Sequence, residues 1–85
     1  MELSEIREKI DEVDQELLAL FLKRMSLSAK AAKFKAEKGM KTLDENREKQ
    51  ILDKVSAESA HLEQYSRRLY EKIFELSREY QQSLM

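Results

Sequence analysis

An apolar stripe that runs from Leu3 to Phe34 limits the folds open to this chain. Alternating steps of three and four residues from Leu3 visit ten positions, of which nine are apolar: Leu3, Ile6, Ile10, Val13, Leu17, Leu20, Leu27, Ala31 and Phe34. This spacing is typical of a helix face that packs along other helices. The tenth position is Arg24, whose guanidinium stays charged in proteins. A fixed positive charge therefore interrupts the longest apolar face of the chain.

The helix predicted by this stripe is too long for a compact monomer. About 35 residues at about 1.5 Å each give a helix of roughly 50 Å. A compact domain of 85 residues has a radius of gyration of about 12 Å and hence a diameter near ~30 Å. Apolar surface that projects beyond its own domain must be covered by another chain, and the commonest arrangement is a two-fold dimer. We therefore expect a homodimer.

The composition favours an all-α chain and argues against several classes of protein. The sequence has no proline, one glycine and abundant Leu, Glu, Lys, Ala and Arg, which are strong helix formers. Charged residues make up 39% of the chain, yet the net charge is only -1, so a basic surface for nucleic acid is not expected. Without cysteine the chain can form no disulfide and perform no thiol chemistry.

The sequence does not predict a membrane segment. The longest uninterrupted apolar run, LLALFL, has six residues, far fewer than the roughly 20 needed to span a bilayer. The N-terminal stretch MELSEIREK lacks the basic start and apolar core of a signal peptide. We expect a soluble, cytoplasmic protein.

The pattern predicts three helices in a single domain that covers residues 1–85, at about residues 4–38, 45–58 and 62–84. Ser4 and Asp44 are suitable N-caps, and Gly39 is expected to end the first helix in the left-handed conformation. The second boundary, near residues 57–62, lacks both glycine and proline. The third helix carries an apolar stripe of Leu62, Tyr65, Leu69, Ile73, Leu76, Tyr80 and Leu84.

Polar side chains interrupt apolar faces on all three predicted helices. At about 100° per residue, Lys35 lies within roughly 20° of Arg24, three turns further along. Arg7 points about 100° away from Arg24, so it cannot share the pocket of Arg24 within one straight helix, but it could reach the pocket of a partner chain. On the second helix Glu48 shares a stripe with Ile51, Leu52 and Val55. On the third, a second stripe consists of Tyr70, Phe74, Ser77 and Gln81.

Each of these residues also has a purely structural interpretation. Arg24 could pair with Glu48 in a buried salt bridge, and Asp44 could act only as a helix cap. Lys35 could extend toward solvent from the helix end, and the polar end of the third helix could be a wet face. Their occurrence together on three helices favours a shared polar site, because one buried ion pair needs only two members.

The segments IREKIDEVDQELLALFLKR, KFKAEKG, DENRE and SREYQ, in this order and spacing, resemble the all-helical chorismate mutases over about residues 3–82. The resemblance implies an intertwined homodimer of three-helix protomers. It also implies an isomerase that converts chorismate to prephenate in phenylalanine and tyrosine biosynthesis, without a cofactor, a metal or a covalent intermediate.

The same resemblance implies roles for individual residues. Arg24 of one protomer and Arg7 of the other would hold the two substrate carboxylates. Lys35 and Gln81 would hydrogen-bond the ether oxygen whose bond breaks. Glu48, with Asp44 nearby, would bind the ring hydroxyl, and supporting contacts would come from Arg47 and Ser77. The chain departs from the family at Glu45, where proline is frequent.

Two other functions remain open at this point. One is a lyase of the same fold that cleaves pyruvate from isochorismate. Since that substrate carries its ring hydroxyl elsewhere, Glu48 favours the mutase. The other is a helical dimerisation module without enzymatic activity.

Overall fold

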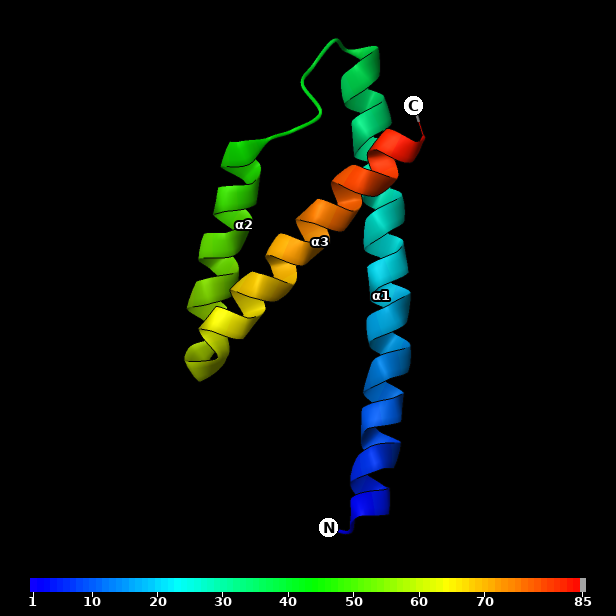
Figure 1. Cartoon of the computed structure of the whole chain (residues 1–85), viewed down its shortest axis with the longest axis vertical. Coiled ribbons are helices and arrows are strands. Elements are labelled where there is room, and N and C mark those ends of the chain that lie inside the picture. Colours follow the sequence, from blue (N-terminus) through cyan, green and yellow to red (C-terminus); the bar gives the residue numbers. More distant parts are fainter. Residues whose placement is uncertain (85) are drawn as a thin grey trace.

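Three α-helices and one short 3-10 turn make up the part of the chain, residues 1–84, that the computed structural model describes. Helix α1 covers Leu3–Glu37, α2 covers Glu45–Glu58, the turn η1 covers Ala60–Leu62 and α3 covers Glu63–Ser83. Figure 1 shows α2 and α3 as a hairpin, with α3 running diagonally from α2 to the C-terminal half of α1. The N-terminal half of α1 extends past both other helices (Figure 1).

Both ends of the connection between α1 and α2 are closed by local hydrogen bonds. Gly39 has φ 68, the left-handed conformation that glycine adopts without steric cost. Its N–H donates to the carbonyl of Ala36, and the N–H of Met40 donates to that of Lys35, which is the Schellman arrangement. Helix α2 then begins after Asp44, whose side chain accepts a hydrogen bond from the backbone N–H of Arg47 at 3.0 Å.

Ser4 is not the N-cap of the first helix, so that prediction is wrong. Helix α1 begins one residue earlier, at Leu3, and the capping position is occupied by Glu2 without a side-chain hydrogen bond. The backbone hydrogen bond from Ile6 N–H to the Glu2 carbonyl, at 3.1 Å, already belongs to the first turn. At an exposed helix end water can satisfy the first N–H groups, so the helix extends there without a side-chain cap.

The turn between α2 and α3 is made without glycine. Ser59 follows the last residue of α2, and Ala60 has φ 50, a left-handed conformation that a residue with a Cβ rarely adopts. The chain continues through η1 and enters α3 at Glu63. The boundary near residues 57–62 therefore lies where a single strained residue reverses the chain.

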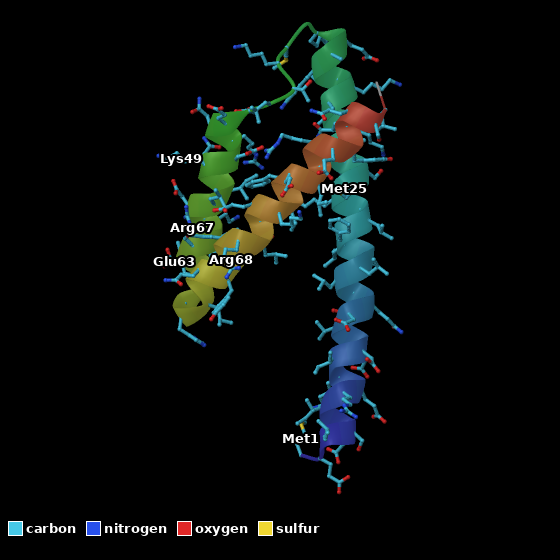
Figure 2. The ribbon with its side chains drawn as sticks, in the orientation of Figure 1. Met1, Met25, Lys49, Glu63, Arg67 and Arg68 are labelled. Carbon is cyan, nitrogen blue, oxygen red and sulfur yellow. The ribbon has the colours of Figure 1, made fainter. Side chains whose placement is uncertain are left out.

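The chain by itself buries very little apolar surface. Among the described residues only Ala32 and Phe74 are buried apolar residues. Residues 1–20 are all exposed, and in Figure 2 their side chains extend from α1 without contacting another helix. Five residues of the apolar stripe predicted for the third helix also stay exposed: Tyr65, Leu69 and Tyr80 on α3, Leu62 at the end of η1 and Leu84 directly after α3.

The overall dimensions also show that the chain is less compact than a globular domain of its length. The radius of gyration is 15.9 Å and the longest extent is 55 Å, whereas a compact chain of this length has a radius of gyration of about 12 Å. Within residues 1–84, no helix combines the length and the hydropathy that crossing a bilayer requires.

Candidate active site

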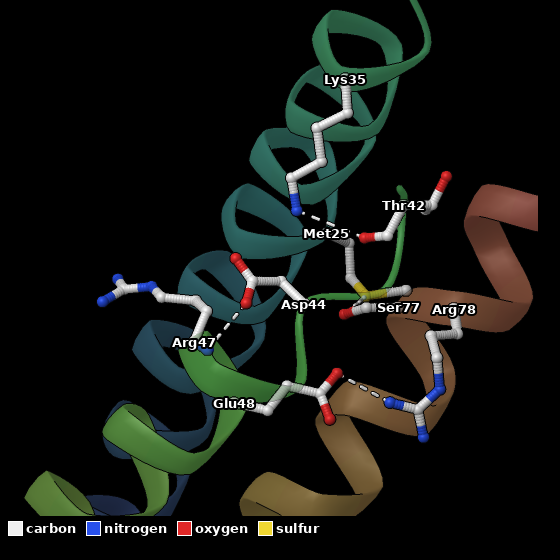
Figure 3. A network of polar contacts seen from close by, with 8 residues as sticks. All are labelled: Met25, Lys35, Thr42, Asp44, Arg47, Glu48, Ser77 and Arg78. Atoms are coloured by element: carbon white, nitrogen blue, oxygen red, sulfur yellow. Dashed lines mark hydrogen bonds and ion pairs between the residues drawn. The ribbon is translucent and has the colours of Figure 1, made fainter. Parts of the chain in front are cut away.

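A cavity of about 330 Å³ lies where α3 crosses α1, and the start of α2 closes its other side. Seven of the eight residues singled out from the sequence line it: Arg24, Lys35, Asp44, Arg47, Glu48, Ser77 and Gln81. The apolar part of its wall includes Leu27, Leu43, Ile51 and Phe74. Residues far apart in the sequence therefore meet in one cavity (Figure 3).

The charged groups of the cavity have a positive excess. Four cations line it, namely Arg24, Lys35, Arg47 and Arg78, against the two carboxylates of Asp44 and Glu48. Four positive and two negative charges leave an excess of two. Since charges are less screened in a partly enclosed site than in bulk water, this excess favours a ligand with two negative charges.

The guanidinium of Arg24 packs against two aromatic rings and not against a carboxylate. Its guanidinium carbon lies 5.9 Å from the ring centroid of Tyr70 and 5.6 Å from that of Phe74, within cation–π range. The suggested salt bridge with Glu48 is wrong, because Glu48 Oε2 instead accepts a hydrogen bond from Arg78 at 2.8 Å. Within residues 1–84 no ion pair involves Arg24. Its five N–H donors therefore remain available to an anionic ligand.

Lys35 and Gln81 place hydrogen-bond donors in the cavity from two different helices. The ammonium of Lys35 donates to the carbonyl of Thr42 at 3.3 Å, so its side chain turns toward the loop. The side-chain amide of Gln81 donates to the carbonyl of Ser28 on α1, also at 3.3 Å. An ammonium has three protons and an amide has two, so each group can make at least one further hydrogen bond.

The remaining predicted residues line the wall with specific local contacts. Asp44 Oδ1 caps α2 (Figure 3), which leaves its second carboxylate oxygen for other contacts. Ser77 is buried at 6% exposure, and its hydroxyl donates to the sulfur of Met25 at 3.5 Å. The side chain of Arg47 is exposed, and Arg47 also lines a neighbouring groove between α2 and Arg24.

The sequence was compared with protein families, curated proteins and solved structures. The model of the family described as chorismate mutase type II matches residues 6–82, which is nearly the whole chain. The chain belongs to the chorismate mutase type II family. A curated chorismate mutase of Methanocaldococcus jannaschii is 43% identical over 53 residues, which cover 62% of this chain and 54% of that protein. The match thus spans about half the length of that relative. No solved structure matches the chain.

Arg7 is the one predicted residue that the cavity of this chorismate mutase family member does not include. It is exposed on the free half of α1, seventeen residues before Arg24, and this separation corresponds to roughly 25 Å along the helix. The expectation that Arg7 serves the site of a partner chain stays a prediction.

Arg78 is a cavity residue that the sequence reasoning missed. It follows Ser77 directly, and it lies four residues after Phe74 and three before Gln81. These are the separations that bring side chains together on one helix face. The segment SREYQ therefore contained the information, but the sequence analysis considered only Ser77 and Gln81 within it.

Proposed function

We propose that this protein is a chorismate mutase, which rearranges chorismate to prephenate within one bound molecule. The cavity that carries four cations, two carboxylates and an apolar wall supports this function. So does membership of the chorismate mutase type II family. Chorismate is a dianion, which matches the positive excess of two.

The chemistry of this rearrangement explains why these residue types suffice. The reaction is unimolecular and pericyclic, so it proceeds without a nucleophile or an acid–base pair. The protein must hold a flexible dianion in a compact, chair-like conformation, and guanidinium groups grip carboxylates well because they bind in a bidentate manner. It must also meet the negative charge that grows on the ether oxygen with donors already in place. A rate acceleration of order 10⁶ corresponds to about 8 kcal/mol, which these two effects together can supply.

Each cavity residue takes one of these tasks. Arg24 binds a substrate carboxylate with its free guanidinium. Lys35 and Gln81 donate to the ether oxygen with the protons that Thr42 and Ser28 leave unused. Glu48 accepts a hydrogen bond from the ring hydroxyl.

Three further residues support these contacts. Asp44 lies near Glu48, four residues before it on the same side of α2. Arg47 adds donors at the cavity wall. Ser77 adds a hydroxyl whose single proton is engaged by the sulfur of Met25 and whose oxygen can accept a hydrogen bond.

The active form in this proposal is an intertwined homodimer. Leu3, Leu17 and Leu20 in the stripe on α1 are more than half exposed. With two buried apolar residues among those that the structure describes, a single chain lacks a core that could stabilise it alone. A partner that covers the free half of α1 also brings in the second carboxylate-binding group, Arg7 of the partner subunit.

The experiment that tests this function follows the loss of chorismate absorbance with the purified protein. We expect turnover by the wild type, and loss of at least about 10³-fold in Arg24→Ala and Lys35→Ala, because each variant removes a charged contact to the transition state. Both variants should keep their helical circular dichroism and their assembly state, since neither side chain takes part in an ion pair within residues 1–84.

Two outcomes would reject the proposal. A flat absorbance trace at high protein concentration would mean that the chain is not a mutase. Release of pyruvate without prephenate would assign it instead to lyase chemistry.

A further inference from the structure

Arg78 is a cation of the cavity that has no task in the reaction described above. It lies on α3, and its Nη1 donates to Oε2 of Glu48 on α2 at 2.8 Å. Figure 3 shows this ion pair crossing from one helix to the other beside Ser77. The side chains of Arg78 and Glu48 are 40% and 29% exposed, so the pair is partly enclosed and still accessible to a ligand in the cavity.

The geometry of the pair leaves half of the Glu48 carboxylate free. Only Oε2 accepts from Arg78, and within residues 1–84 no side chain donates to Oε1. A carboxylate can accept through both oxygens. Arg78 thus restricts the rotation of the group by binding one oxygen, while the other remains able to accept a hydrogen bond from a hydroxyl group.

The charge of the pair also matters for a dianionic ligand. Glu48 and Asp44 both carry negative charge in a cavity that is expected to take two carboxylates. With Arg78 present, the cavity has four cations and two carboxylates. Without Arg78 its excess falls from two positive charges to one, and Glu48 faces the ligand unpaired. A charge-assisted hydrogen bond of this kind offsets the repulsion between Glu48 and the ligand.

We propose that Arg78 is a positioning residue that acts through Glu48: it holds the Glu48 carboxylate with Oε1 free to accept the substrate hydroxyl, and it neutralises that carboxylate toward a dianionic substrate. The inference rests on the proposed function and goes beyond it, because it assigns a role to a residue outside the substrate contacts. Arg78 itself does not touch the substrate.

A double-mutant cycle on the full-length protein tests this coupling. Arg78→Met keeps an unbranched apolar side chain but removes the guanidinium, and Glu48→Gln removes the charge that Arg78 holds. We expect Arg78→Met to lower kcat/KM about tenfold, mainly through KM, because the hydroxyl contact exists in both the bound substrate and the transition state. Arg78→Lys should recover part of the loss, since it keeps the charge without the fork.

The combined variant provides the decisive comparison. Arg78→Met together with Glu48→Gln leaves three cations and one carboxylate, so its excess of two equals that of the wild type. Its kcat/KM should be no lower than that of Glu48→Gln alone. If Arg78→Met causes the same tenfold loss in the Glu48→Gln background, Arg78 acts on the substrate directly and the proposal is overturned.

Arg67 provides a matched control for the possibility that Arg78 only holds α3 against α2. Its Nη1 donates to the hydroxyl of Ser56 at 2.6 Å, which also joins α3 to α2. Arg67 lies eleven residues before Arg78 on α3, or roughly 16 Å along the helix, at the far end of the hairpin (Figure 2). Arg67→Met should lower the melting temperature without raising KM. A rise in KM equal to that of Arg78→Met would show that both arginines only hold the helices together.

A binding measurement separates this inference from the proposed function. The probes are a stable cyclic ether dicarboxylic acid with a ring hydroxyl and its counterpart without the hydroxyl, titrated by calorimetry. We expect Arg78→Met to weaken the hydroxylated compound about tenfold more than the other compound. Equal weakening of both contradicts the positioning of Glu48 by Arg78, whether or not the wild type converts chorismate. Absence of turnover in the wild type contradicts only the proposed function.

Discussion

Two donors of the cavity, Lys35 and Gln81, are held in place by backbone carbonyls and not by carboxylates. Lys35 donates to Thr42 and Gln81 donates to Ser28, so each side chain has a defined position before any ligand arrives. Donors that need no rearrangement stabilise developing charge most effectively, because the protein does not reorganise during the reaction. The choice of an amide at position 81 has a further consequence, since an amide donates at every pH.

Gln81→Glu should convert this pH-independent donor into a pH-dependent one. A protonated carboxyl donates a hydrogen bond, whereas an ionised carboxylate only accepts and repels the ether oxygen as negative charge grows there. Since the ordinary pKa of a glutamic acid is about 4.3, the variant should be nearly inactive at about pH 8 and gain activity as the pH falls toward about 5. The measurement is kcat as a function of pH for the variant and the wild type.

The neighbouring Gln82, which is exposed and does not line the cavity, supplies the control. Gln82→Glu adds the same charge to the same helix and should leave the pH profile unchanged. Full activity of Gln81→Glu at about pH 8 would mean that the amide of Gln81 is not a required donor.

At the scale of elements, the two connections reverse the chain with different residues. Gly39 and Ala60 both have positive φ, at 68 and 50. Around Gly39 a Cβ would meet no atom within 4 Å, so only backbone conformation opposes a larger residue there. At Ala60 the Cβ is already present and the conformation is strained.

Exchanging the two residue types should therefore change stability in opposite directions. Gly39→Ala should lower the free energy of unfolding by about 1 kcal/mol, because alanine is disfavoured in the left-handed region. Ala60→Gly should raise it by up to about 1 kcal/mol, since the relief of strain exceeds the added entropy of the unfolded chain. Denaturant midpoints at one fixed protein concentration measure both effects. Stabilisation by Gly39→Ala would show that the left-handed conformation is not maintained in solution.

The helices themselves could be predicted because each depends on local pattern. The stripe on α1, the glycine after it and the Asp44 cap are all properties of residues close in sequence. The exact start of α1 could not be predicted, since an exposed helix end is satisfied by water as well as by a side chain. The reversal at Ala60 carries no local marker, because alanine is among the best helix formers.

At the scale of the whole molecule, the apolar faces of α1 and α3 exceed what one protomer can cover. Nine large apolar side chains between Leu3 and Leu27 of α1 stay exposed: Leu3, Ile6, Ile10, Val13, Leu17, Leu18, Leu20, Leu22 and Leu27. Most of the stripe along η1, α3 and the residue after α3 also stays exposed: Leu62, Tyr65, Leu69, Tyr80 and Leu84. Surface of this extent is typical of an interface between chains. In the proposed homodimer each site combines Arg24 of one protomer with Arg7 of the partner subunit.

Mixing two inactive variants tests this shared site. Arg7→Ala and Arg24→Ala should each lack activity as pure proteins. After unfolding and refolding together in equal amounts, about half of the dimers contain one chain of each kind, and in these one of the two sites has both arginines. The mixture should therefore recover about a quarter of the wild-type activity. No recovery, despite a mixed dimer seen by native mass spectrometry, would show that Arg7 and Arg24 act within one protomer or not at all.

The sequence by itself determined the three helices, the long apolar face of the first and the set of polar residues that interrupt such faces. Periodicity gives the angle of each side chain around its own helix axis. These angles were enough to group Arg24 with Lys35 and to separate Arg7 from both. Only the tertiary structure decided that Glu48 pairs with Arg78 and that Arg24 lies against Tyr70 and Phe74. The crossing of α3 between α1 and α2 determines these partners, and a crossing depends on contacts between helices that no single helix encodes.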